Sequence, residues 1–151
     1  MKRFRFPLRP VALMRADREL RAREALAAAF EVCRQGQERL LAVRDRLTDL
    51  EGVMRAGRTG TFRASEAVAA GHAYRRECGA ELEAQKQLAA AQAAMEKRRG
   101  ACIEANRDHK IILKLEEKAR VRHRDEMMRA EQIEIDETAS RRAALQRLSL
   151  S

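Results

Sequence analysis

Apolar residues recur along the chain in alternating steps of three and four, which is the pattern of a coiled-coil helix. In the first half this repeat lasts for more than four heptads and predicts one long helix over residues 11–56. A second repeat starts at Tyr74 and predicts a helix over residues 74–148. The first repeat consists of Ala22, Leu26, Ala29, Cys33, Gly36, Leu40, Val43, Leu47, Leu50 and Met54, and the second of Tyr74, Cys78, Leu82, Gln85, Leu88, Gln92 and Met95.

The segment between the two repeats, residues 57–73, has the composition of a chain reversal. It opens with two glycines in the run GRTGTFRAS, and Ser65 suits the N-cap of the next helix. Gly71 lowers the helix propensity of the segment before residue 74, so the sequence allows either a short helix or a kink there. Residues 1–10 contain both prolines and predict an extended basic leader. The sequence therefore predicts one all-α domain, an antiparallel two-helix coiled-coil hairpin with a longer second helix.

The length of the second helix predicts an overhang. A tight reversal pairs residues whose numbers sum to about 122, and helix two continues well beyond the start of helix one. From Glu104 to Arg142 charges occupy nearly every face of the predicted helix. Such a helix has little apolar area and is marginal in water, so we expect a partner to cover it. The expected facing pairs in the hairpin are Leu47 with Tyr74, Leu40 with Leu82, Cys33 with Leu88, and Leu26 with Met95.

Composition and charge limit the class of protein. Charged residues make up 36% of the chain and aromatic residues 3%, which allows a thin, elongated core but not a thick globular one. The formal charge of +9 favours an acidic partner. The basic residues are interleaved with 23 acidic ones, and no aromatic residues are placed to stack on bases. We therefore expect protein partners and no nucleic acid.

No arrangement of residues predicts catalysis or a bound cofactor. His72, His109 and His123 lack metal-ligand spacing with the cysteines, and the GRTGT run does not match a phosphate-binding loop. Carboxylates on a continuous helix have no pocket that would shift a pKa or exclude water. The sequence predicts a protein that is not an enzyme and holds neither a cofactor nor a metal.

Cysteine usage and hydropathy predict a cytoplasmic protein. Cys33, Cys78 and Cys102 are odd in number and widely spaced, which is typical of reduced, unpaired thiols. No apolar run approaches the about 18 residues that would span a bilayer, so no transmembrane insertion is expected.

Two motifs near the chain ends carry a family resemblance. The leader reads F-R-F-P-L-x-P-V from Phe4 to Val11. Further on, K-L-E-E-K from Lys114 precedes the pattern E-Q-x-E-x-D-E-x-A-x-x-R, which starts at Glu131 and ends at Arg142. These motifs, together with the central turn, resemble the FliJ and YscO family of type III export proteins over nearly the whole chain.

The resemblance implies the central stalk of an export ATPase in a flagellum or injectisome. The coiled coil would enter the hexameric ATPase ring and link it to the membrane export gate, at a cytoplasmic position peripheral to the export apparatus. Export chaperones are a further class of partner that it leaves open. The implied gate contact falls on Tyr74 and Cys78, and the ring contact on Phe4, Phe6, Arg120, Arg124, Arg129, Glu131, Asp136 and Glu137.

A different class of protein remains as an alternative. The heptads alone would also suit a cytosolic coiled-coil scaffold that associates with nucleic acid or the cytoskeleton and oligomerises through its apolar seam.

Overall fold

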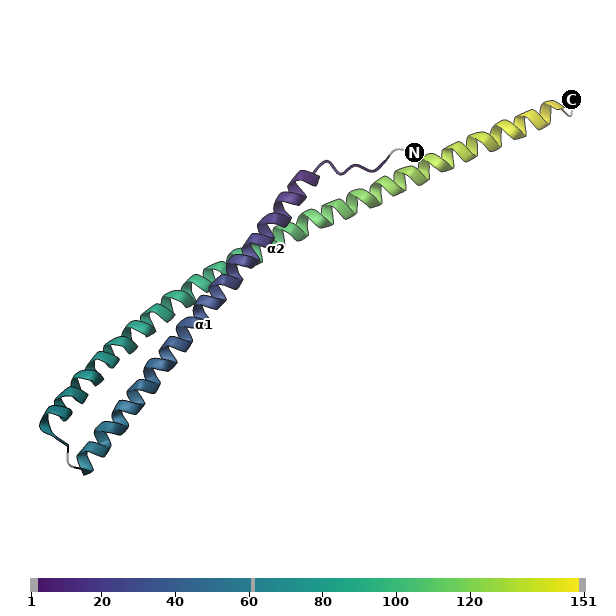
Figure 1. Ribbon diagram of the computed structural model, residues 1–151. Helices are drawn as coiled ribbons and strands as arrows, with labels where there is room; N and C mark the ends of the chain where they lie inside the picture. Colours follow the sequence, from purple (N-terminus) through teal and green to yellow (C-terminus); the bar gives the residue numbers. More distant parts are fainter. Residues whose placement is uncertain (1–2, 61, 150–151) are drawn as a thin grey trace. The chain divides into compact units, whose positions relative to one another are not determined.

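The protein consists of two long α-helices joined by a short turn (Figure 1). The computed structural model describes residues 3–60 and 62–149. Helix α1 spans Arg9–Thr59 and has 51 residues, and helix α2 spans Ala64–Ser149 and has 86 residues. The predicted all-α hairpin with a longer second helix is therefore confirmed.

The chain divides into two compact units, and both helices contribute to each. Arg18–Ala105 form one unit, which contains the turn and which we call the hairpin unit. Met1–Asp17 and Asn106–Ser151 form the other, the terminal unit.

Both helices extend further than the sequence predicted, and the turn is correspondingly shorter. α1 begins at Arg9, ahead of Pro10, because proline is tolerated in the first helical turn, where its missing N–H would have no partner. Residues 64–73, predicted as turn or short helix, form the start of α2. Gly71 does not interrupt it, and no described glycine has a positive φ. A cost of about 1 kcal/mol for a glycine is small beside the packing along a helix of this length.

The start of α2 is capped by Arg63, two positions earlier than the sequence suggested. The carboxylate of Glu66 accepts a hydrogen bond of 3.2 Å from the backbone N–H of Arg63. In return the carbonyl of Arg63 accepts bonds of 2.9 and 3.1 Å from the N–H groups of Glu66 and Ala67. Ser65 is therefore inside the helix and is not its N-cap. Glu66 satisfies the backbone donor from the third helical position, as in a capping box.

The core of the hairpin unit is a narrow seam between α1 and α2, which run antiparallel and side by side (Figure 1). On α1 the buried apolar residues fall at positions of the first heptad repeat, and others of that repeat are half-buried. A Cβ added to Gly36 would lie 3.3 Å from Cδ1 of Leu88, so the two backbones approach closely there. The buried apolar residues of α1 are Cys33, Leu40, Val43 and Leu47, and the half-buried ones include Leu26, Leu50 and Met54.

The register of α2 against α1 differs from the predicted one by one to three residues. Ion pairs join Arg44 to Glu81 at 2.9 Å and Arg46 to Glu77 at 3.0 Å. The residue numbers in these pairs sum to 125 and 123, against the expected 122. This shift moves α2 along α1 by less than one turn. It changes which residues lie opposite one another, such as Leu40 and Leu82, but the face of α2 that packs is set by the rotation of the helix about its own axis.

Part of the predicted α2 seam is wrong. Leu82 is 55% exposed and does not face Leu40, and Cys78 is exposed too. The real face keeps Tyr74, Leu88 and Met95 of the predicted repeat. Its other members are mostly alanine and acidic residues whose stems pack at its edge. Its half-buried members include Tyr74, Glu77, Glu81, Ala84, Leu88, Ala91, Met95 and Cys102.

The three cysteines lie in the hairpin unit and are all free. Cys33 is buried, Cys102 is half-buried and Cys78 is exposed.

Phe62 closes the turn by packing on α1. A Cβ added to Gly57 would lie 2.4 Å from Cδ2 of Phe62, so the ring occupies the space that a side chain would need. With Met54, Ala67 and Ala70, these residues line an apolar cleft of about 200 Å3. Gly57 has a helical backbone, which any residue can adopt. Glycine is therefore needed here for the close approach of the Phe62 ring and not for its backbone conformation.

The terminal unit shortens the predicted overhang. Ile112 is 2% exposed, and the guanidinium of Arg15 donates a hydrogen bond of 2.9 Å to the carbonyl of Asp108. The leader, residues 3–8, continues along α2 as far as His123. An extended residue spans about 3.3 Å and a helical one 1.5 Å, so a short leader covers a longer stretch of helix. The uncovered part of α2 therefore starts after residue 123, and not at Glu104.

We predict that Leu40→Asp destabilises the hairpin by on the order of 3 kcal/mol or more, because it places an unpaired charge in the narrow seam. Leu41→Asp is the matched control: it makes the same change one residue on, at a side chain that is 63% exposed, and should cost at most about 0.5 kcal/mol. Thermal unfolding followed by circular dichroism measures both. Equal melting curves for the two variants would show that the seam is wrongly placed.

We also predict that the effect of Gly57→Ala on the stability of the hairpin depends on whether Phe62 is present. In the natural chain it should destabilise the hairpin, because the new methyl group displaces the Phe62 ring. In a Phe62→Ala background the same change should stabilise it by up to about 1 kcal/mol, since alanine is the better helix former. A double-mutant cycle on urea unfolding provides the measurement, and the same sign in both backgrounds would contradict the packing of Phe62 on Gly57.

Candidate partner-binding surfaces

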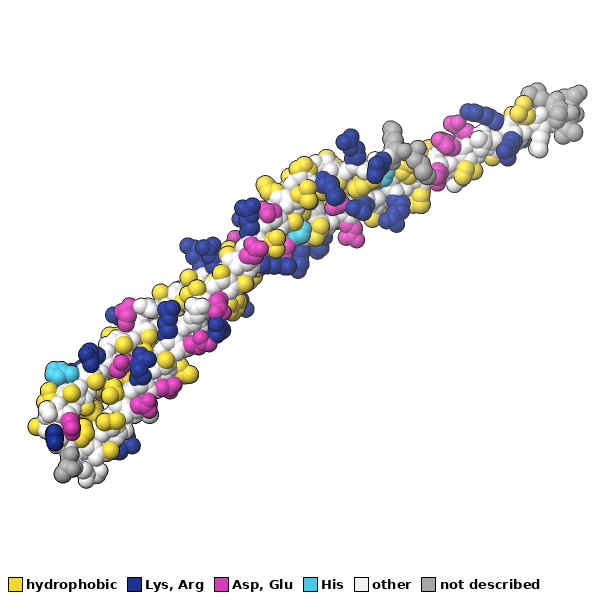
Figure 2. All heavy atoms as spheres, viewed as in Figure 1, with side chains coloured by type: hydrophobic (Ala, Val, Ile, Leu, Met, Phe, Trp, Pro, Cys, Tyr) yellow, Lys and Arg dark blue, Asp and Glu magenta, His cyan; other side chains and the backbone are white. Residues whose placement is uncertain are grey.

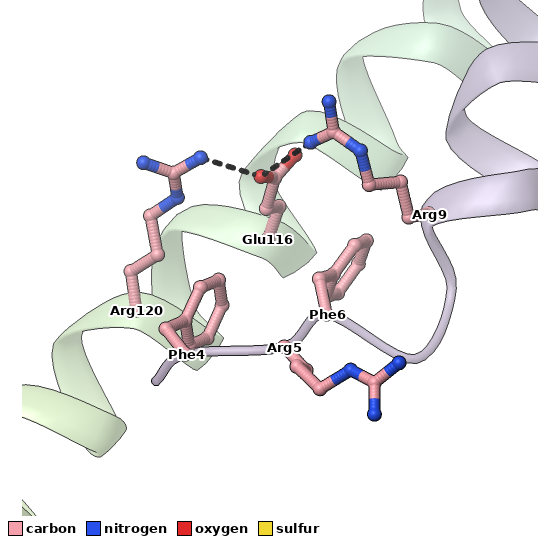
Figure 3. A pocket seen from close by; sticks show the side chains of 6 residues that line it. All are labelled: Phe4, Arg5, Phe6, Arg9, Glu116 and Arg120. Carbon is pink, nitrogen blue, oxygen red and sulfur yellow. Dashed lines mark hydrogen bonds and ion pairs between the residues drawn. The ribbon is translucent and has the colours of Figure 1, made fainter. Parts of the chain in front are cut away.

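The leader and α2 enclose a cleft of about 420 Å3 in the terminal unit, which we call the leader cleft (Figure 3). Phe4 and Phe6 come from the leader, Arg9 from the first turn of α1, and Glu116 and Arg120 from α2. The side chain of Arg5 points away from Glu116, on the opposite side of the leader from the two phenylalanine rings (Figure 3). The lining residues are Phe4, Arg5, Phe6, Arg9, Glu116 and Arg120.

One carboxylate holds two guanidinium groups in this cleft. Oε1 of Glu116 accepts a hydrogen bond of 2.7 Å from Nη2 of Arg120. The same oxygen lies 4.0 Å from Nη1 of Arg9. The side chain of Glu116 is 15% exposed, whereas those of Arg9 and Arg120 are 66% and 60% exposed. The carboxylate is thus screened from water, and the two cations keep an open side.

Aromatic contacts fix the leader to α2. The ring of Phe4 lies 5.5 Å from that of His123 between centroids, at an interplanar angle of 46°. The guanidinium carbon of Arg120 lies 5.6 Å from the Phe4 centroid, a cation–π contact of about 0.5–1 kcal/mol. Pro7 favours an extended backbone at Phe6, so α1 does not extend back into the leader. The extended leader presents both phenylalanines to α2.

The structure brings together three of the predicted ring-contact residues, Phe4, Phe6 and Arg120, and adds others. Glu116 and Arg9 were absent from the predicted site. A usable signal was the seven-residue spacing of Ala105, Ile112 and Ala119, which continues the α2 seam toward the leader. The density of charges in this part of α2 concealed it.

The other predicted ring-contact residues lie on the part of α2 that follows the leader cleft. We call residues 124–147 the distal helix. Every side chain in it is exposed except that of Met127, which is half-buried. Helical pairs join Gln132 to Asp136 at 2.9 Å and Arg141 to Glu137 at 3.2 Å. The residues predicted for the contact that lie here are Arg124, Arg129, Glu131, Asp136 and Glu137, all exposed.

The two residues implied for the gate contact differ in their surroundings. The hydroxyl of Tyr74 donates a hydrogen bond of 3.2 Å to Glu51 of α1. This bond raises the pKa of the Tyr74 phenol, because the carboxylate favours the protonated donor. Tyr74 also lines a cleft of about 300 Å3 with Glu51, Met54, Arg55 and Arg58. Cys78 is exposed, and it is not among the residues that line this cleft.

The described residues contain neither a membrane span nor a metal site. None of their helices is long and apolar enough to cross a membrane. Within residues 3–60 and 62–149, no group of three or more His, Cys, Asp or Glu side chains is placed to hold a metal ion.

These features define a coiled-coil protein that offers surfaces to partners. The surfaces are the uncovered distal helix and the clefts beside the leader and the turn. The sequence matches the family described as "Flagellar FliJ protein" over residues 4–148 of 151, and the chain belongs to this family. As a member it is a non-enzymatic protein of the flagellar export apparatus. No curated protein and no solved structure matches the chain.

We predict that Phe4→Ala loosens the leader and leaves the hairpin intact. Losing about 1 kcal/mol of ring contacts should raise the population of detached leader about fivefold. Trypsin cleavage after Arg5, normalised to a free peptide of the same sequence, should accelerate by that factor. Leu8→Ala, at a leader side chain that is 41% exposed, serves as the control and should have little effect. Unchanged cleavage of the Phe4 variant would mean that the ring contacts do not hold the leader.

Proposed function

We propose that this protein is the central stalk of the flagellar export ATPase complex. In this proposal the distal helix and the leader enter the hexameric ATPase ring, and the region around the turn contacts the membrane export gate. The stalk is then a cytoplasmic protein, peripheral to the membrane export apparatus. Family membership supports the export role, and the arrangement of exposed surfaces supports the division between the two ends of α2.

The observation that carries the proposal is the exposure of the distal helix. A helix of this length without a packed face is marginal in water, because helices in proteins are stabilised mainly by tertiary packing. No described segment of the chain covers residues 124–147. The interior of a protein ring would cover them on all sides.

The charges of the distal helix suit a surface that must move within its partner. It carries six acidic and five basic residues, and both signs are visible along it in Figure 2. Successive residues are about 100° apart, so these charges are distributed around the helix. Exposed ion pairs contribute at most about 1 kcal/mol each, so many such contacts hold the helix without fixing one rotational position.

The proposed gate contact is the cleft beside Tyr74 in the hairpin unit. Tyr74 is held by Glu51 on the neighbouring helix, and Met54 gives the cleft an apolar wall. Cys78, one turn further along α2, adds an exposed thiol next to this surface.

We predict that Arg124→Glu combined with Arg129→Glu abolishes stimulation of the export ATPase from the same organism and leaves thermal unfolding unchanged. Both side chains are exposed, and reversing them removes two positive charges from the proposed contact. Arg120 is left intact because its reversal would set a carboxylate beside Glu116 and detach the leader. Steady-state ATP hydrolysis at physiological salt is the measurement.

A matched control separates the local contact from overall charge. Arg39→Glu combined with Arg98→Glu changes the net charge equally, at exposed sites in the hairpin unit. This control should retain stimulation within about twofold. If the distal variant stimulates as well as the natural protein, the distal helix is not the ATPase contact.

A further inference from the structure

We propose that the leader cleft binds a carboxylate side chain from an acidic segment of the protein's partner. The inference rests on the proposed function for the identity of that partner, the export ATPase, and deepens it by naming the chemistry that the cleft recognises. It is carried by the balance of charge, the fixed geometry and the aromatic walls of the cleft.

The balance of charge leaves the cleft positive. Three arginines and one acidic residue line it, and the single carboxylate, Glu116, already serves two of the arginines. Both contacts fall on the same oxygen, Oε1. Each guanidinium has five N–H donors, so Arg9 and Arg120 retain donors that Glu116 does not engage. A second carboxylate would complete the pairing.

The geometry holds these donors in place before a ligand arrives. Arg120 is bound on one side by Glu116 and lies against the Phe4 ring on another. Glu116 is nearly covered, which gives it few alternative positions. A guanidinium fixed in this way loses less freedom on binding than a free surface arginine, and its planar fork matches a carboxylate with two parallel hydrogen bonds.

The aromatic walls increase the strength of such a contact. Phe4 and Phe6 are half-buried and present their rings on the same side of the leader as the Arg120 guanidinium (Figure 3). Apolar walls displace water, and a charge-assisted hydrogen bond is stronger where water is excluded. The cleft volume of about 420 Å3 falls within the range of ligand-binding clefts and admits a side chain with part of its backbone.

An acidic peptide fits these features better than a nucleic acid strand. A strand would need several cations along a groove and free ring faces for its bases. Here the excess charge is concentrated at one point, and the Phe4 ring is already engaged by His123 and Arg120. Single-point recognition of this kind suits one Asp or Glu on a protein loop.

Hexaglutamate and hexathymidylate serve as the probes, and two variants of equal net charge serve as the comparison. Arg9→Gln with Arg120→Gln alters the cleft. Arg107→Gln with Arg122→Gln removes two charges from exposed sites in the same unit that do not line it. Isothermal titration calorimetry gives the affinity of each protein, and the arginine side-chain NMR signals of the natural protein show where the peptide binds. The His123 ring signals, which sense Phe4, show whether the leader stays in place.

The expected result is that hexaglutamate binds the natural protein saturably, shifts the signals of Arg9 and Arg120, and binds the cleft variant about tenfold more weakly. The Arg107 and Arg122 variant should bind within about twofold of the natural protein. The leader should remain seated in both. Stimulation of the export ATPase should fall in the cleft variant only.

Three outcomes would overturn the inference. Equal weakening in the two variants would mean that overall charge and not the cleft attracts the peptide. Hexathymidylate binding as tightly as hexaglutamate, with the same arginine shifts, would identify a phosphate site instead. Loss of peptide binding only where the leader detaches would assign the two arginines a structural role. In each case, intact sensitivity of ATPase stimulation to the distal-helix variant would leave the stalk proposal standing.

Discussion

The narrow packing of α1 against α2 in the hairpin unit is the interaction on which the other features depend. Its apolar content is small. Cys33, Leu40, Val43 and Leu47 are the buried apolar residues of α1, and α2 contributes mostly alanine and the stems of longer side chains. A seam of this kind stabilises by length and close approach, and Gly36 opposite Leu88 shows how close the backbones come. Because the seam is thin, one charge or one misplaced methyl group affects a large fraction of the total stability.

The leader extends this packing by different means. Beyond the start of α1 there is no second helix, yet α2 remains covered as far as His123 because the extended leader spans it with few residues. The contact depends on two rings and on one screened carboxylate, Glu116, rather than on an apolar seam. A contact of this kind can be stable enough to hold the leader and still leave arginine donors exposed to a partner. The leader therefore has two roles: it packs on α2, and in our proposal it holds the arginines that bind a carboxylate.

The distal helix shows the opposite balance between stability and function. Its sequence favours helix through residues such as Ala, Glu and Arg and through pairs such as Glu137 with Arg141. These contributions are small, and no described part of the chain packs on it. The proposed stalk role accounts for this exposure, because in that proposal the partner supplies the missing contacts.

The sequence by itself determined the class of fold, because heptad spacing, the placement of both prolines in the leader and the glycine-rich turn are local signals. It also identified the α1 positions that are buried or half-buried, from Leu26 to Met54, since large and small apolar residues alternate there without ambiguity. Only the tertiary structure decided the face of α2. Alanine-rich repeats specify a face weakly, so Leu82 appeared to belong to the seam and is in fact exposed. The same limit applies to the leader cleft, where Phe4, Glu116 and Arg120 are distant in sequence or ordinary in type. Their meeting depends on the register of two helices and on an extended leader, which are properties of three-dimensional packing that no local pattern encodes.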